Sequence, residues 1–86
     1  MHALFIGGTV DNTEVDMDDT HPPTHYPPNT GSGHPRYRLH QIGKQDRQLV
    51  YAVYGAPELP AEEVSRIADE RGYARRFAAQ VEDVAR

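Results

Sequence analysis

Residues 48–54 constrain the fold of this chain most strongly, because they are rich in β-branched and aromatic side chains along their whole length. Their apolar side chains fall on both faces of an extended strand, and a strand buried on both faces belongs at the centre of a sheet. The short apolar run at residues 3–6, which ends at Gly7-Gly8, has the same character. We therefore expect these two strands to pair in the middle of a sheet that needs cover on both faces.

Two further strands complete the predicted sheet. Residues 13–17 alternate between apolar and acidic side chains, which is typical of a half-exposed strand. The turn-forming pair Asp11-Asn12 joins them to residues 3–6 as a hairpin. Residues 37–42 are interpreted as the third strand in chain order, and residues 43–46 as the turn that leads into residues 48–54.

The rest of the chain is predicted to be helical. Pro60 suits a first helical turn, apolar residues recur at helical spacing after it, and Gly72 is a suitable C-terminal stop. A second apolar stripe follows with spacings of four, four and three, so two short helices that break at Gly72 are favoured over one long helix. The members of this second stripe are Tyr73, Phe77, Val81 and Val84.

These elements predict one α+β domain over residues 1–86, with a small antiparallel sheet of about four strands and one or two C-terminal helices packed on one face. Its predicted parts are a hairpin at residues 1–17, a long ordered loop at 18–35, a second hairpin at 36–55 and the helical segment at 59–86. The helices can cover only one face of the sheet. The loop, a second copy of the chain or a partner must cover the other face.

The loop at residues 18–35 holds five of the seven prolines and three of the five histidines. Its segments His21-Pro22-Pro23 and Tyr26-Pro27-Pro28 favour an extended, polyproline-like backbone that loses little entropy on binding. Tyrosine and histidine side chains add rigid contact area of the kind found at interfaces. We therefore predict a partner-binding surface made of the loop and the start of the next strand, comprising His21, His25, Tyr26, His34, Arg36, Tyr37 and Arg38.

Metal, cofactor and catalytic chemistry are not expected. Cysteine is absent, and the prolines between His21 and His25 prevent the helix that would align two histidine ligands. Gly7-Gly8 lacks the third glycine or the Gly-Lys-Ser/Thr of a phosphate-binding loop, so it is interpreted as part of a tight hairpin. No serine stands in a recognisable nucleophile context. The carboxylates and histidines of the candidate metal cluster have the spacing of no known motif; they are Asp16, Asp18, Asp19, His21 and His25.

Charge is unevenly distributed along the chain. Residues 1–30 carry five acids and no lysine or arginine, whereas residues 31–55 carry four basic residues and one acid. One interpretation places an acidic hairpin beside a basic one in the same sheet, and the other is steering of a charged partner. The pI of about 5.6 weighs against a nucleic-acid-binding face, although Arg36-Tyr37-Arg38 has suitable residue types.

No apolar run approaches the roughly 18 residues of a membrane span, and the N-terminus lacks the basic start of a secretory signal. We therefore expect an intracellular protein.

The opening run Leu4-Phe5-Ile6-Gly7-Gly8-Thr9-Val10-Asp11-Asn12 resembles small tailed-bacteriophage proteins that begin with an apolar strand and a Gly-Gly-Pro-x-Asp-Gly turn. Tyr37-Arg38, the Tyr- and Val-rich residues 50–54 and Ala61-Glu62-Glu63 follow in the order of that group, out to about Tyr73. Thr9 and Asn12 depart from the turn, and residues 74–86 extend beyond the pattern. The resemblance implies a phage origin and action in the bacterial cytoplasm or in the virion, and it brings no catalytic residues.

We therefore expect a non-enzymatic phage accessory protein that binds another protein and inhibits a host enzyme or defence complex. The alternatives are a minor virion or assembly component that self-associates, and a nucleic-acid-binding regulator.

Overall fold

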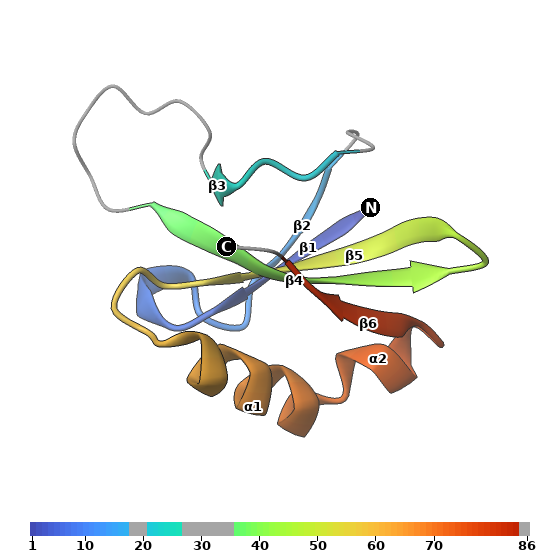
Figure 1. Ribbon diagram of the computed structural model, residues 1–86. Helices are drawn as coiled ribbons and strands as arrows, with labels where there is room; N and C mark the ends of the chain where they lie inside the picture. The colour runs from blue at the N-terminus through green and yellow to red at the C-terminus, as the bar shows by residue number, and fades with distance from the viewer. Residues whose placement is uncertain (18–20, 27–35, 85–86) are drawn as a thin grey trace.

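The computed structural model describes residues 1–17, 21–26 and 36–84, and it is an α+β fold with a sheet core and one main helix (Figure 1). The strand order is β2-β1-β5-β4-β3, and β6 pairs with another part of β4. The strands are β1 (His2–Ile6), β2 (Glu14–Asp16), β3 (His25–Tyr26), β4 (Tyr37–Gln45), β5 (Gln48–Gly55) and β6 (Gln80–Asp83); the helices are α1 (Ala61–Arg71), α2 (Tyr73–Arg76) and the 3-10 turn η1 (Gly8–Val10).

The two strands with apolar side chains on both faces, β1 and β5, lie side by side in the middle of the sheet, as predicted. They run parallel, with His2 opposite Tyr51 and Ile6 opposite Gly55. The other pairings are antiparallel, so the sheet is mixed and the prediction of an antiparallel sheet was wrong. The reason is which strand of the second hairpin lies against β1. The strands β4 and β5 run in opposite directions, and β5, which runs in the same direction as β1, is the one beside it.

The described residues contain six strands where about four were predicted. One added strand, β3, comes from the proline-rich loop, and the other, β6, comes from residues predicted to be helical. The predicted break at Gly72 is present: its φ is +67°, and its amide donates to the carbonyls of Ala68 and Asp69. The second helix is a single turn that ends before Ala78, where φ is +50°. Val81 therefore lies on an edge strand, because the free edge of β4 offers it backbone hydrogen bonds.

The β4–β5 turn also differs from the prediction of residues 43–46. The strand β4 continues to Gln45, and the turn is made by Asp46 and Arg47, which have φ values of +52° and +69°. Positive φ at both central residues is the geometry of a type I′ hairpin turn. Gly43 lies inside β4, where the ring of Tyr51 occupies the space above its Cα.

The helices cover one face of the sheet, as predicted, and Figure 1 shows them below it. The core on this face is formed by alternate residues of the two central strands and by apolar residues of the helices. Its buried members are Leu4, Ile6, Tyr51, Val53, Val64, Ala68 and Tyr73.

The opposite face has a second buried core, made of Ala3, Phe5, Leu39, Ala52 and Tyr54. Tyr26 of β3 packs on this core with its ring centroid 5.3 Å from that of Phe5. The hydroxyl of Tyr54 donates to the carbonyl oxygen of Pro23 at 2.7 Å. Residues 21–26 therefore supply cover on the second face, which was one of the three coverings that the sequence left open.

Strands β1 and β5 separate β2, which carries Glu14 and Asp16, from β4, which carries Arg38 and Lys44. Asp11 forms an ion pair with Arg71 of α1 at 2.8 Å, and Glu14 forms one with Arg76 of α2 at 2.6 Å. Lys44 of β4 is paired with Glu82 of β6 at 3.1 Å. Asp11, Glu14 and Lys44 are thus paired with the C-terminal segment, and not with one another across the two hairpins as one interpretation of the charge pattern expected.

Helices within the described residues are all too short or too polar to cross a membrane.

Candidate functional site

The structure divides the residues that the sequence assigned to partner binding. Tyr26 lies opposite Tyr37 in the β3–β4 ladder, and both rings pack on the core of the face away from the helices. His25 lies opposite Arg38 in the same ladder. Neighbouring residues of a strand point to opposite faces, so His25 and Arg38 point away from that core.

The remaining predicted residues do not complete one surface. His21 is exposed and Arg36 is half-buried, and each makes an interaction within the molecule. His34 lies outside the described residues. Two of the predicted aromatic anchors are thus used by the fold itself, and they do not form a single exposed patch with the basic residues.

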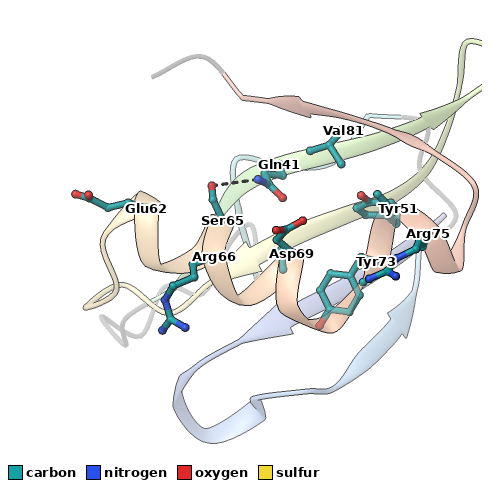
Figure 2. Close-up of a pocket in the computed structure, with 12 residues that line it drawn as sticks. Gln41, Tyr51, Glu62, Ser65, Arg66, Asp69, Tyr73, Arg75 and Val81 are labelled. Atoms are coloured by element: carbon teal, nitrogen blue, oxygen red, sulfur yellow. Dashed lines mark hydrogen bonds between the residues drawn. The ribbon is translucent and has the colours of Figure 1, made fainter.

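A different feature has the shape of a binding site. A groove of about 550 Å³ lies between α1 and β6. In Figure 2, α1 forms one wall with Glu62, Ser65 and Asp69, and Val81 of β6 lies on the opposite side. Gln41 and Tyr51 form the floor, and α2 closes one end. Sequence reasoning missed this groove because it assigned Val81 to a helix.

Gln41 is the buried polar residue at the centre of the groove, with an exposed fraction of 8%. Its Nε2 donates to Oγ of Ser65 at 3.1 Å and lies 3.4 Å from Oδ1 of Asp83. A register shift between Leu39 and Gln41 leaves His40 as the extra residue of a β-bulge. A bulge re-aims the side chains that follow it, which is how a polar residue of β4 comes to face α1.

The outer edge of β6 runs beside this groove. The amide of Val84 donates to the carbonyl of His40 at 3.0 Å, and the register places Asp83 opposite Gln41 and Val81 opposite Gly43. In an antiparallel ladder the bonded pairs alternate. The N–H and C=O groups of Val81 and Asp83 therefore point away from β4, and no strand of the described chain pairs with them.

Charges along the groove belong mainly to α1. Arg66 is engaged on the solvent side of the helix, where its guanidinium contacts Glu63 at 2.8 Å and Glu70 at 2.6 Å. The hydrogen bond from Arg66 lowers the pKa of Glu63, and the charge of Arg66 adds to the effect. Glu62 and Asp69 line the groove itself.

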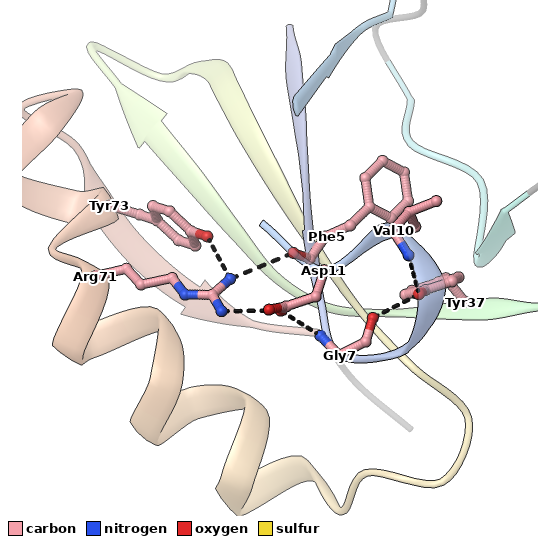
Figure 3. A network of polar contacts seen from close by, with 7 residues as sticks. All are labelled: Phe5, Gly7, Val10, Asp11, Tyr37, Arg71 and Tyr73. Atoms are coloured by element: carbon pink, nitrogen blue, oxygen red, sulfur yellow. Dashed lines mark hydrogen bonds and ion pairs between the residues drawn. The ribbon is translucent and has the colours of Figure 1, made fainter. Parts of the chain in front are cut away.

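A separate polar network holds the Gly7-Gly8 loop (Figure 3). The Gly7 amide donates to Oδ1 of Asp11 at 2.7 Å, and the Tyr37 hydroxyl donates to the Gly7 carbonyl at 2.5 Å. The same Asp11 oxygen accepts from Nη2 of Arg71 at 2.8 Å. The bond from Gly7 and the bond from Arg71 lower the pKa of Asp11. Both backbone polar groups of Gly7 are therefore hydrogen-bonded within the molecule. Through Tyr37 and Arg71, these bonds connect the loop after β1 to β4 and to α1.

No group of three or more potential metal ligands comes together among the residues that the structure describes. Asp18 and Asp19 of the candidate metal cluster lie outside those residues.

Comparison of the chain with protein-family models, with curated proteins and with solved structures gave no match.

Proposed function

We propose that this protein is a non-enzymatic binding protein that captures an extended segment of another protein on the outer edge of β6. The observation that carries the proposal is the position of this edge, whose outward backbone groups lie beside a groove of about 550 Å³. Addition of a strand to an exposed sheet edge is a recurring mode of peptide recognition, in which main-chain hydrogen bonds give affinity and pockets for alternate side chains give specificity.

The exposed side chains of β6 support this role. All four residues of the strand are exposed, and Val81 has an exposed fraction of 44%. Val81 is one of two large hydrophobic residues exposed in the described part of the chain. An incoming strand would cover this side chain and would pair with both outward-facing residues of β6.

Charge favours a foreign partner over a second copy of the chain. The edge strand β2 carries Glu14 and Asp16, and the edge strand β6 carries Glu82 and Asp83. Two copies that met edge to edge would bring like charges together, and acids on an edge are a common protection against self-association. The resemblance to phage proteins suggests a host enzyme or defence complex as the partner, in the bacterial cytoplasm.

The experiment compares two proline variants in a pull-down from bacterial lysate at physiological salt. Val81→Pro removes an outward N–H from β6 and leaves the bonds to β4 in place. Asp16→Pro is the matched control, because the bonds from Phe5 to Thr13 and from Met17 to Met1 place the Asp16 N–H on the outer edge of β2.

We expect wild type and Asp16→Pro to retain the same bacterial protein and Val81→Pro to lose it, with both variants still folded by circular dichroism. Equal retention by both variants would refute recognition through β6. A stable ring or multimer in solution sizing would support the assembly role instead.

A further inference from the structure

The groups that line the middle of the groove are mainly hydrogen-bond acceptors. Gln41 uses its Nε2 within the molecule, and Figure 2 shows its oxygen pointing away from Ser65 toward the groove. Asp69 of α1 lies across from it, and Glu62 lies toward the open end. Gln41 is buried, whereas Asp69 and Glu62 are exposed carboxylates at the rim of the groove. Amide and carboxylate oxygens accept hydrogen bonds, and cationic donors give the strongest ones.

Apolar surface accompanies these acceptors. Tyr51, Ala68 and Val81 line the same groove. The buried ring of Tyr51 lies against Gly43, in the space that a side chain at position 43 would occupy. A site with an apolar floor and acceptors around it suits a side chain with a long aliphatic stem and a cationic head, which is the character of arginine and lysine.

We infer that the groove binds an arginine or lysine side chain of the partner segment, with the stem against Val81 and the head between Asp69 and the Gln41 oxygen. This inference rests on the proposed function, because it takes β6 as the edge to which the segment adds. A strand added to β6 directs alternate side chains to the side of the sheet that carries α1.

The two arginines that line the groove do not satisfy these acceptors. Arg66 is held by Glu63 and Glu70 on the solvent side of α1. Arg75 lies beside Tyr73 at the α2 end, away from Glu62 (Figure 2).

The length of the groove indicates how much of the partner segment lies along it. The stretch of α1 from Glu62 to Asp69 spans two turns of helix, or about 10 Å, which is the length of about three residues of an extended segment.

The test is an NMR titration of the ¹⁵N-labelled protein with two probe peptides. The first is an acetylated and amidated pentapeptide of alternating valine and arginine, and the second replaces each arginine by glutamate. We expect the arginine peptide to shift the amide signals of Val81 and Asp83 and the side-chain amide of Gln41, and we expect no saturable shift with the glutamate peptide.

Asp69→Asn should weaken binding of the arginine peptide by about fivefold, which is the upper range for the loss of a partly solvated ion pair. Glu58→Gln, which removes one exposed negative charge outside the groove, is the matched control and should leave the affinity unchanged. Absence of binding, equal binding of both peptides, or equal loss in the two variants would overturn the inference. The proline variants decide the role of β6 independently, so the two failures are distinguishable.

Discussion

Replacement of Gly43 by alanine tests the packing beneath the groove. A Cβ atom at this position would lie 2.1 Å from Cε2 and 2.4 Å from Cζ of the Tyr51 ring. Carbon atoms in favourable contact are about 3.5–4.0 Å apart, so the ring has to move by about 1.4 Å. Tyr51 is 1% exposed, and its ring centroid lies 6.2 Å from that of Tyr73 in α2 and 5.2 Å from that of Phe77 just after α2. Movement of the ring therefore displaces α2 as well.

The expected cost follows from two opposing effects. Overpacking of a buried side chain destabilises a protein by about 1–3 kcal/mol, and this site is at the upper end because backbone and ring are in contact. Removal of a glycine from a strand returns about 0.5–1 kcal/mol. Gly43→Ala should therefore lower the free energy of unfolding by about 2 kcal/mol, which in a domain of this size lowers Tm by about 8–16 °C.

Urea unfolding followed by circular dichroism measures this loss. Gly72→Ala is the comparison, because its nearest contact would be the flexible Arg75 side chain at 3.6 Å and only its φ of +67° is strained; it should cost about 1 kcal/mol. In a Tyr51→Leu background the Gly43→Ala cost should nearly vanish. If Gly43→Ala costs less than about 0.5 kcal/mol, or costs the same with Leu at position 51, the reasoning is wrong.

Three further outcomes are expected. Tyr26→Ala should lower the free energy of unfolding by about 2 kcal/mol because its ring covers the second core, whereas Tyr26→Phe should cost little; equal melting of Ala and Phe variants would contradict this. The pKa of Asp11 is lowered from 3.8, so its contribution is present above pH 3.8 and is lost as the pH falls through the folded pKa. Asp11→Asn should accordingly lower Tm at pH 7, and this penalty should shrink as the pH is lowered below 3.8; a penalty that stays constant as the pH falls would refute the role of the carboxylate. Burial raises the pKa of Tyr51 and Tyr54, so stability should be lost as the pH rises above 10, and ultraviolet titration should show these two phenols ionising only on unfolding.

Local patterns predicted much of the fold because they report local physics. The turn at Asn12 was predicted from residue type, and its φ of +62° is the left-handed conformation that asparagine tolerates. The helix stop at Gly72 was predicted from the absence of a side chain. Both properties depend on a few neighbouring atoms.

The candidate site could not be predicted in the same way. Val81 stands four residues after Phe77, a spacing that suits a helical stripe, and only the free edge of β4 turns this residue into part of a strand. No residue type near His40 indicates the bulge that directs Gln41 toward α1. Tyr26 looked like an exposed anchor until its pairing with Tyr37 placed its ring on the core.

The sequence by itself determined which strands are central, because side chains that are apolar on both faces can be buried only in the middle of a sheet. It also determined the main helix and its end. Only the tertiary structure decided that β1 and β5 run parallel, that residues 21–26 cover the second face, and that β6 and α1 enclose a groove. The physical reason is the sequence separation of the contacts. Periodicity shows which side chains of one segment have to be buried, whereas strand pairing joins segments that are distant in sequence. The free energy of such a pairing depends on which strand edges remain free after the rest of the chain has packed.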